Sequence, residues 1–216
     1  MPAILTDDPK TLENMIRQAE AFTDYVQFDI MDGKFVPSRS IDCEHLAAIP
    51  TKLGWEAHLM VQHPDEHLDC LRTAGTQKIV FHFESAASPA EVIGQARRLG
   101  LGVGLAVNPE TPVSAILPLT SRVDSILFLT VNPGFYGSQF IPEVMDKVVE
   151  LRKAIPNAEI GVDGGIKEGN VAQIAQFGVN YICVGSAIFM QTDPAARFRR
   201  LTKLAQGTSY KPDMQA

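Results

Sequence analysis

The chain has little of several features that would assign it to a special class of protein. It has one tryptophan, and its 216 residues include only three cysteines. These cysteines, Cys43, Cys70 and Cys183, are odd in number, widely spaced and form no Cys-x-x-Cys pair. Such a set predicts buried, reduced thiols in a cytosolic protein rather than a disulfide framework.

Long apolar runs and an excess of positive charge are also absent. No run approaches the ~20 apolar residues of a membrane span, and the first residues show no signal-peptide pattern. The formal net charge of −6 argues against a nucleic-acid partner. We therefore expect a cytoplasmic protein that binds neither membrane nor nucleic acid. An anionic substrate stays compatible with this charge, because backbone dipoles can bind an anion locally.

What the chain does have is a regular alternation of short apolar runs and longer helical patterns. The apolar runs predict eight strands, at Pro2–Leu5, Tyr25–Met31, Trp55–Leu59, Lys78–His82, Gly102–Val107, Ser125–Val131, Glu159–Asp163 and Tyr181–Val184. Apolar residues at three- and four-residue spacing predict helices at about 9–21, 42–48, 64–74, 89–99, 113–118, 142–155, 170–177 and 194–205.

The helix boundaries carry recognisable signals. Four helices begin with a capping residue before a proline, the pairs being Asp8-Pro9, Ser88-Pro89, Thr111-Pro112 and Asp193-Pro194. Three helices end before a glycine that accepts the left-handed conformation, namely Gly75, Gly100 and Gly178.

Eight βα units without a break in composition predict an α/β protein, a single-domain (β/α)₈ TIM barrel over residues 1–206. Residues 207–216 are polar and predict a tail outside the fold. The main alternative is an open doubly wound sheet. That fold usually has a glycine-rich turn after its first strand, whereas here Thr6-Asp7-Asp8-Pro9 follows it.

Polar residues stand at the ends of three predicted strands. Asp29, His58 and Asp163 each close an apolar run, and Gln27 lies two residues before Asp29, on the same strand face. In parallel barrels the chemistry lies at the carboxyl ends of the strands, so these side chains are expected to converge. Singly, a strand-end aspartate could equally cap the next helix, and a lone histidine could be structural. Together they predict a metal-assisted proton-transfer site.

At these residues the chain resembles the ribulose-5-phosphate 3-epimerase family. The matching stretches extend over nearly the whole length and are Asp29–Pro37, His58–Met60, Phe81–His82, Ala106–Pro109, Thr130–Phe135, Phe140–Val144, Val162–Gly165 and Gly185–Ile188. The resemblance implies the conversion of D-ribulose 5-phosphate to D-xylulose 5-phosphate, or of a related ketose phosphate. It also implies a homo-oligomer.

The resemblance also implies one divalent metal ion (Zn, Fe, Mn or Co) held by two aspartates and two histidines. Asp29, His58 and Asp163 match three of these ligands, and Gln27 stands where the family has its second histidine. Asp29 and Asp163 would also be the catalytic acid and base, on opposite faces of the sugar carbon. A metal-stabilised enediolate between two carboxylates is sound chemistry for moving a proton next to a ketone.

Other positions point to the rest of a substrate pocket. Glycine-containing loops follow the seventh and eighth strands, where barrels often bind phosphate, and we assign Gly164, Gly165, Gly185 and Ser186 to phosphate binding. The loop after the sixth strand is the expected lid, and its Gly134 and Gly137 are assigned to phosphate or substrate binding as well. Met31 and Met60 match part of a methionine layer that the family places beside the site, although both could be core residues.

The chain departs from the family pattern at several positions. Gln27 replaces a histidine, and an amide oxygen is a poorer ligand than imidazole for zinc or iron, so the metal could be weaker, different or absent. Ala3 replaces a serine that contacts the substrate in the family, and Leu129 replaces a methionine. In the lid, Tyr136 replaces a glycine, and Ser138-Gln139 appears in swapped order.

Two other functions stay open on the sequence alone. The departures at Gln27 and Ala3 suit a non-catalytic phosphosugar-binding protein. A related barrel decarboxylase is the second alternative, but those relatives carry Asp-x-Lys-x-x-Asp, and Met31 stands at the lysine position. His82 fits all three functions, either as a residue that orients a metal ligand or as a polar residue at the barrel mouth. His45, His63 and His67 are expected in solvent.

Overall fold

Eight parallel strands form one sheet in the computed structural model, in the sequence order β1 to β8. The structure describes residues 1–134 and 139–207. The strands are β1 (Ala3–Ile4), β2 (Tyr25–Met31), β3 (Gly54–Met60), β4 (Lys78–His82), β5 (Gly102–Val107), β6 (Ser125–Leu129), β7 (Ile160–Asp163) and β8 (Tyr181–Cys183). Each lies within two residues of its predicted bounds.

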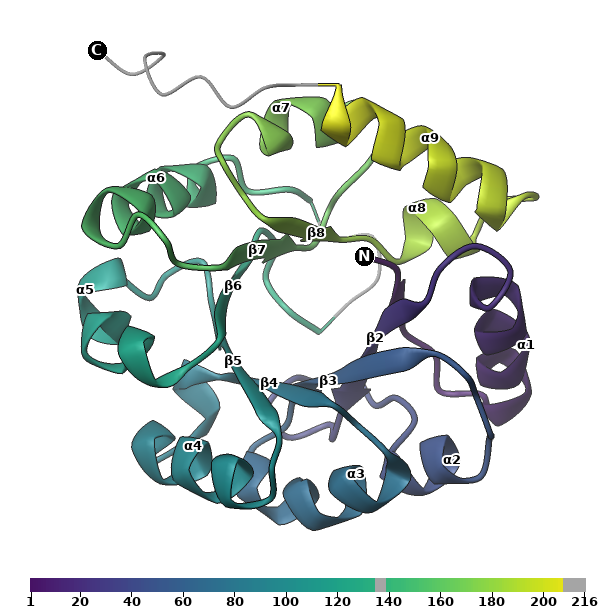
Figure 1. Ribbon diagram of the computed structural model, residues 1–216, viewed down its shortest axis with the longest axis horizontal. Helices are drawn as coiled ribbons and strands as arrows, with labels where there is room; N and C mark the ends of the chain where they lie inside the picture. The colour runs from purple at the N-terminus through teal and green to yellow at the C-terminus, as the bar shows by residue number, and fades with distance from the viewer. Residues whose placement is uncertain (135–138, 208–216) are drawn as a thin grey trace.

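The sheet closes on itself through the first residues of the chain. Ala3 donates its N–H to the carbonyl of Val184, and Val184 donates to the carbonyl of Met1, both at 2.9 Å. Pro2 and Val184 form the parallel bridge between these segments. Figure 1 looks down the resulting ring of strands, with the helices outside it. The barrel prediction is confirmed, and the alternative of an open doubly wound sheet is wrong.

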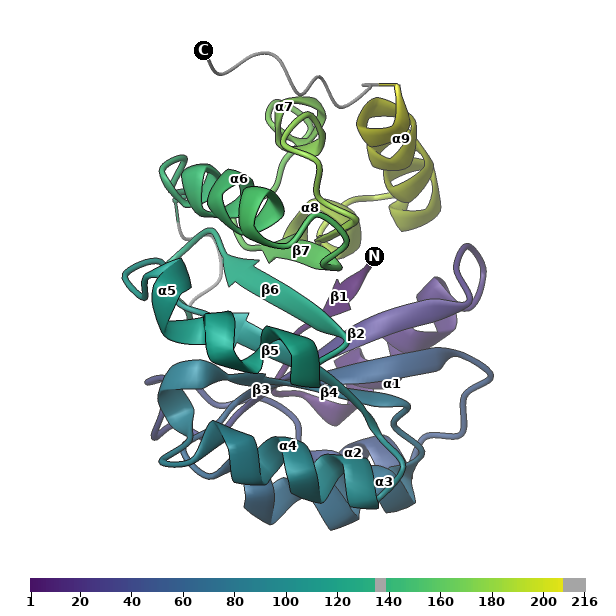
Figure 2. The same ribbon diagram turned by 60° about the vertical axis from the view of Figure 1, so that its left-hand side comes forward.

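Helices cover the outer face of this sheet. They are α1 (Pro9–Ala19), α2 (Cys43–Ala47), α3 (Leu68–Ala74), α4 (Pro89–Arg98), α5 (Val113–Ile116), α6 (Val144–Ala154), α7 (Val171–Ala175), α8 (Ser186–Phe189) and α9 (Pro194–Gln206). Short 3₁₀ turns lie at Pro64–His67, Phe83–Ser85 and Leu117–Arg122. In Figure 2, α6, α7 and α9 cover the β6–β8 side, and α2, α3 and α4 cover the opposite side. The four-residue α8 was not predicted, because it is too short for an apolar period.

The predicted helix boundaries are only partly correct. Asp8 and Asp193 cap α1 and α9 through their side chains. Ser88 makes no side-chain cap, and its backbone carbonyl alone starts α4. Thr111 makes no side-chain cap either, because α5 begins at Val113, one residue later than the Thr111-Pro112 pair predicts. The Thr111 hydroxyl donates to Glu84 instead. The glycine signals at the helix ends are confirmed, since Gly75, Gly100 and Gly178 have positive φ angles of 98°, 76° and 79°.

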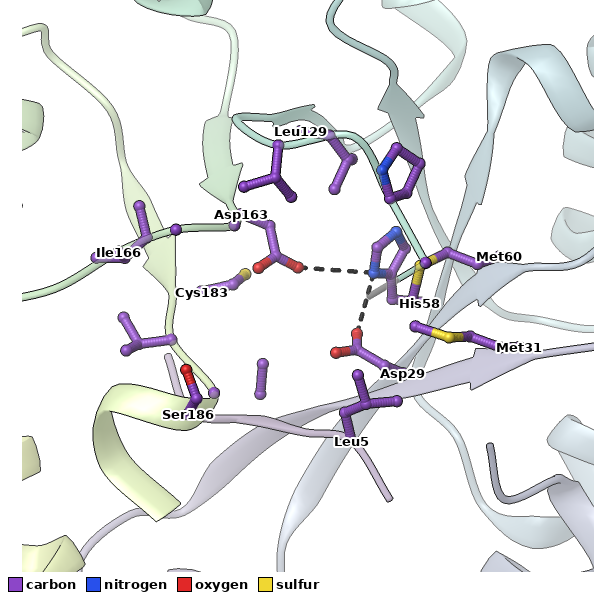
Figure 3. A pocket seen from close by; sticks show the side chains of 18 residues that line it. Leu5, Asp29, Met31, His58, Met60, Leu129, Asp163, Ile166, Cys183 and Ser186 are labelled. Carbon is purple, nitrogen blue, oxygen red and sulfur yellow. Dashed lines mark hydrogen bonds and ion pairs between the residues drawn. The ribbon is translucent and has the colours of Figure 1, made fainter. Parts of the chain in front are cut away.

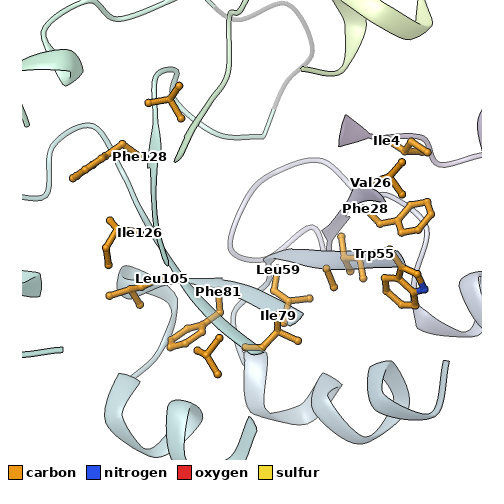
Figure 4. Packing of buried hydrophobic residues seen from close by; sticks show 14 of the residues in the cluster. Ile4, Val26, Phe28, Trp55, Leu59, Ile79, Phe81, Leu105, Ile126 and Phe128 are labelled. Atoms are coloured by element: carbon orange, nitrogen blue, oxygen red, sulfur yellow. The ribbon is translucent and has the colours of Figure 1, made fainter. Parts of the chain in front are cut away.

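The core has two layers, because strand side chains alternate between the faces of the barrel. Outward-facing side chains such as Phe28, Phe81 and Phe128 pack against the helices, as Figure 4 shows. A smaller interior cluster contains Ala3, Val80, Ala106, Leu127, Leu129 and Cys183. The interior also holds polar side chains at the mouth, and these form the site described below.

The cysteines differ from the sequence prediction. Cys43 at the start of α2 and Cys70 on α3 form a disulfide, with Cα atoms 6.0 Å apart, so the expectation of reduced thiols is wrong for these two. The reason is tertiary, since α2 and α3 pack side by side and bring together residues 27 positions apart. Cys183 remains a free, buried thiol, as predicted.

Removing this disulfide is expected to lower the free energy of unfolding by about 3 kcal/mol, because the cross-link restricts the unfolded chain. Urea unfolding of the oxidised protein, of the protein with dithiothreitol, and of a Cys43→Ala/Cys70→Ala variant would measure this. The double variant should match the reduced protein and respond no further to dithiothreitol. Equal midpoints in all samples would show that the cross-link does not form in solution.

Among the described residues, no helix combines the length and the apolar character needed to cross a membrane. Helix α9 ends the described barrel at Gln206, and Gly207 is its C-cap. Of the predicted tail at 207–216, residues 208–216 lie outside the described part of the chain.

Candidate functional site

Three strands carry the predicted acid, base and imidazole to one place. Asp29 on β2 pairs in register with His58 on β3, and Asp163 closes β7 beside Cys183 on β8. Figure 3 shows that Asp29 and Asp163 approach the His58 ring from different walls of the barrel. The convergence predicted from the strand ends is therefore present.

The geometry of this cluster is tight. His58 Nδ1 lies 3.0 Å from Asp29 Oδ1 and 3.6 Å from Asp163 Oδ2. One ligand atom from each of the three residues lies within 4.8 Å of the other two. An imidazole nitrogen and two carboxylate oxygens at this spacing could hold a divalent metal ion.

Gln27 lies against the same cluster and is fully buried. Its Nε2 donates to Asp29 Oδ1 at 2.9 Å and to Asp163 Oδ2 at 2.8 Å. Its Oε1 accepts a hydrogen bond from Cys183 Sγ at 3.3 Å. The amide therefore faces the carboxylates with its nitrogen, not with the oxygen that a metal would bind.

His82 on β4 contacts the far side of the His58 ring. The two Nε2 atoms are 3.0 Å apart and the rings stack, so one nitrogen donates to the other. On its opposite side, His82 Nδ1 faces Glu84 Oε2 at 3.5 Å, and neither atom has another partner among the described residues. Of the two roles open to His82 from the sequence, the contact with His58 favours orienting a ligand.

Glu84 sets the direction of these hydrogen bonds. Burial alone would raise the pKa of Glu84, but hydrogen bonds from His82, Thr111 and the backbone of Asn108 outweigh it and lower the pKa. The ionised carboxylate therefore accepts a hydrogen bond from His82 Nδ1–H. Burial lowers the pKa of His82, so that ring stays neutral. His82 Nε2 must then accept from His58 Nε2–H.

When His58 is protonated, its Nδ1–H donates to Asp29 Oδ1; when it is neutral, this arrangement leaves an Nδ1 lone pair facing two carboxylates. A lone pair 3.0 Å from a carboxylate oxygen is stable only if a positive charge lies between them. A proton or a divalent cation would satisfy this requirement. Asp29, His58 and Asp163 therefore fit a metal ion by charge and by donor type, and the contact with His82 holds the His58 ring in place.

The same crowding shifts two titrations. Burial and the charge of Asp29 raise the pKa of Asp163 to about 7. Burial alone would lower the pKa of His58, but the hydrogen bond and charge of Asp29 outweigh it and raise the pKa. At neutral pH the cluster therefore holds protons that the same side chains would lose in the unfolded chain.

A pH dependence of stability follows for protein treated with a chelator. Asp163 should release its proton near pH 4 when unfolded and at about 7 when folded. The folded state then binds more protons between these values, so stability falls as pH rises from about 4 to about 7, by up to about 1.4 kcal/mol per pH unit. The His58 shift acts in the same direction at higher pH. Unfolding of the wild type and of Asp163→Asn at several pH values measures the effect, and equal slopes would contradict it.

A pocket opens directly above this cluster. Its described lining includes the predicted residues Ala3, Met31, Met60, Gly134, Gly164, Gly165, Gly185 and Ser186 together with Asp29, His58 and Asp163. Leu129 lines it too, and Met31 and Met60 pack with Val36 in a small apolar cluster. Tyr136 and Gly137 lie outside the described residues.

The loops after β7 and β8 form one wall of this pocket. Within the described chain, the backbone N–H groups of Gly164, Gly165 and Gly185 have no acceptor. Gly164 and Gly165 have φ angles of +109° and +66°, and a Cβ on Gly164 would lie 2.4 Å from Val131. Only glycine brings the backbone this close to the pocket, so the wall can present free N–H groups to an anion.

Sequence reasoning missed part of the lining, including Cys183, Leu5, Val131, Pro133, Ile166 and Val184. For Cys183 a signal was available. It lies two residues before Gly185 on the last strand, and the same alternation that points Gln27 and Asp29 inward applies there. Of the histidines expected in solvent, His45 is partly exposed, and its Nδ1 lies 2.6 Å from Asp42 Oδ1.

Comparison with known proteins shows which family the chain belongs to. A sequence model described as the ribulose-phosphate 3 epimerase family matches residues 1–189. The chain is 38% identical over 197 residues to ribulose-phosphate 3-epimerase of Synechocystis, covering 87% of this chain and 86% of that protein. It is 35% identical over 199 residues to the Schizosaccharomyces pombe enzyme of the same name, covering 89% and 87% of the two chains.

Solved structures show the same fold at low sequence identity. KGPDC from Streptococcus mutans superposes with a TM-score of 0.74 at 10% identity, over 95% of this chain and 96% of that one. The 3-hexulose-6-phosphate synthase of Salmonella typhimurium gives 0.69 at 17% identity, over 96% and 98%. The fold is thus shared by proteins of low sequence identity. Sequence similarity over most of the chain shows that it belongs to the ribulose-phosphate 3-epimerase family and is an epimerase, an enzyme of the isomerase class.

Proposed function

We propose that the protein interconverts D-ribulose 5-phosphate and D-xylulose 5-phosphate by removing and returning the proton on C3. The observation that carries this proposal is the pair of carboxylates at the barrel mouth. Asp29 and Asp163 come from β2 and β7, line one pocket and lie close enough to share the Gln27 amide. Inversion at one carbon needs an acid and a base on opposite faces, and two carboxylates supply both.

The two carboxylates are suited to alternate between acid and base. In the metal-free site, burial and the charge of Asp29 raise the pKa of Asp163 to about 7, so protonated and ionised forms are both populated at neutral pH. Asp29 then removes the C3 proton from one face, and Asp163 returns a proton to the other; the reverse reaction exchanges their roles. Catalytic groups of this kind work best with a pKa near the operating pH.

Negative charge develops on the substrate oxygens when the C3 proton leaves. Asp29, His58 and Asp163 would hold a divalent metal ion, which would supply a Lewis acid to stabilise this charge. Met31, Met60 and Leu129 border the same space with apolar surface, which limits the access of water to the reacting carbon. Ala3 offers no hydroxyl there.

We assign the phosphate of the substrate to the wall formed by the loops after β7 and β8. The N–H groups of Gly164, Gly165 and Gly185, which have no acceptor in the described part of the chain, support this assignment, and Ser186 adds a hydroxyl. Barrels of this type often bind phosphate at these two loops. The carboxylate pair and the phosphate wall share one pocket, as a small sugar phosphate requires.

The decarboxylase alternative finds no support in the pocket. Protonation of a carbanion by lysine would need an ammonium group at the mouth, and the described lining contains no lysine. Met31 stands two residues after Asp29, and Lys34 is exposed beyond the strand end.

The direct test is to incubate the protein with D-ribulose 5-phosphate in heavy water, after metal removal and after loading with Mn²⁺, Co²⁺, Zn²⁺ or Fe²⁺. NMR should show deuterium entering C3 while D-xylulose 5-phosphate forms. Unphosphorylated D-ribulose is the control for the phosphate wall and should react far more slowly. Tight binding without exchange would identify a non-catalytic phosphosugar-binding protein. Failure with every pentulose and hexulose phosphate, under all metal conditions, would refute the epimerase.

A further inference from the structure

The nitrogen of the Gln27 side chain lies at the point on which the three metal-binding groups converge. Gln27 Nε2 is 2.9 Å from Asp29 Oδ1, 2.8 Å from Asp163 Oδ2 and 3.5 Å from His58 Nδ1. These are the atoms that would bind a metal ion. The N–H groups of the amide carry partial positive charge, so they neutralise part of the charge that a cation would otherwise neutralise.

The two carboxylates and Cys183 together favour one orientation of this amide. An amide can turn by about 180° and exchange its oxygen with its nitrogen, and the hydrogen-bonding partners decide between the two orientations. Cys183 Sγ is 3.3 Å from Gln27 Oε1, and its S–H donates to that oxygen. In the opposite orientation, Oε1 would face two carboxylates and the NH₂ group would face another donor.

Burial makes this arrangement rigid. Gln27, Cys183 and His58 have relative exposures of 0%, 0% and 1%. No solvent can therefore replace a partner that the amide loses, and a buried amide oxygen without a donor costs free energy. The thiol lies on β8 and the amide on β2, so the contact crosses the interior of the barrel.

We propose that Gln27 and Cys183 form a lock on the metal site. The N–H groups of the Gln27 amide occupy the position of the cation and neutralise part of the carboxylate charge. A divalent metal ion binds only after the amide turns or withdraws, and this movement breaks the contact between the amide and Cys183. Cys183 is thus a positioning residue that weakens metal binding. The inference rests on the metal site of the proposed function, but its test needs neither substrate nor turnover.

The lock explains how a glutamine can stand at this position without leaving the carboxylates unpaired. An imidazole there would add a lone pair for a metal ion, whereas the amide adds hydrogen-bond donors to Asp29 and Asp163. An apolar residue would leave both carboxylates facing each other in a buried space. The glutamine therefore lowers metal affinity and stabilises the site in the absence of the ion.

The test is a double-mutant cycle on metal affinity. Chelator-treated wild type, Cys183→Val, Gln27→His and the double variant are titrated with Co²⁺, by calorimetry and by the visible absorption of the bound ion. Loss of the thiol donor should make Cys183→Val bind about fivefold more tightly, the equivalent of one ordinary hydrogen bond. Gln27→His should bind at least about tenfold more tightly. In the Gln27→His background, Cys183→Val should change nothing.

Two further variants guard against a change of packing. Cys183→Ala removes the thiol without adding bulk and should also bind Co²⁺ more tightly. Cys183→Ser keeps a donor and should bind as weakly as the wild type or more weakly. Circular dichroism and thermal unfolding confirm that each variant is folded.

Some outcomes would overturn the lock. If Cys183→Val and Cys183→Ala bind Co²⁺ with the wild-type affinity, the thiol does not hold the amide. If Cys183→Val brings an equal gain in the wild-type and the Gln27→His backgrounds, Cys183 acts independently of the amide. If no variant binds metal, Gln27→His included, the metal site itself is wrong and the lock falls with it.

Discussion

Asp29→Asn and Asp163→Asn are each expected to lower the rate of epimerisation of D-ribulose 5-phosphate by at least about a thousandfold. Asparagine keeps the shape of aspartate but can neither take up nor deliver a proton near neutral pH. Inversion needs a proton to leave one face of C3 and another to arrive at the opposite face, so either substitution alone stops it. Product formation, measured by NMR at a saturating metal concentration, is the readout.

The stereochemistry of any remaining exchange makes this prediction sharper. If Asp163 is replaced, Asp29 can still remove a proton from its own face, but the proton must return to that face. Deuterium that enters C3 should therefore appear in the starting epimer and not in the inverted product. Asp29→Asn should show the mirror-image behaviour, with D-xylulose 5-phosphate as the substrate.

Asp65→Asn is a suitable control, because Asp65 is exposed in the 3₁₀ turn after β3 and lies away from the pocket lining. It should retain full activity. Near-normal formation of inverted product by either site variant would show that the assigned acid–base pair is wrong. Metal affinity should be measured in parallel, because Asp29 and Asp163 are also metal-ligand candidates.

Glu84→Gln is expected to weaken both metal binding and kcat/KM by about 10- to 100-fold, although Glu84 touches neither metal nor substrate in this proposal. Glu84 Oε1 accepts hydrogen bonds from Asn108 N–H and from the Thr111 hydroxyl. A glutamine would keep its oxygen at that position, so its NH₂ group would face His82 Nδ1. That contact reverses the direction of both hydrogen bonds in the series that runs from residue 84 through His82 to His58.

The reversal has a specific consequence at the site. His82 Nδ1 becomes an acceptor, His82 Nε2 a donor and His58 Nε2 an acceptor, which places the His58 proton on Nδ1. That nitrogen can then no longer offer a lone pair to a metal ion. Nitrogen-15 NMR of the histidines should report the change of tautomer, a signature that a purely structural role would not produce.

Glu110→Gln, an exposed substitution close by in the sequence, should leave activity, affinity and the His58 tautomer unchanged. If Glu84→Gln keeps the wild-type tautomer and the wild-type affinity, Glu84 does not orient His58. If it merely unfolds at a lower temperature while the affinity of the folded protein is unchanged, its role is structural.

The architecture and the chemistry-bearing strand ends could be predicted from the amino-acid sequence without coordinates. The alternation of short apolar runs with capped, amphipathic segments was enough to place eight strands, because each signal is local and recurs in every unit. The rule that parallel strands deliver their carboxyl ends to one face then predicted that Asp29, His58 and Asp163 meet. Departures such as Gln27 were visible at the same stage.

Contacts between distant residues required the folded barrel. The Cys43–Cys70 disulfide, the ring contact between His58 and His82 and the thiol–amide contact between Cys183 and Gln27 join separate elements. None follows from a local pattern, since each depends on the register and closure of the barrel. The orientation of the Gln27 amide is the clearest case. The sequence shows an amide at a ligand position. Whether its oxygen or its nitrogen faces the carboxylates depends on those carboxylates and on the Cys183 thiol, which packing brings together from distant parts of the chain.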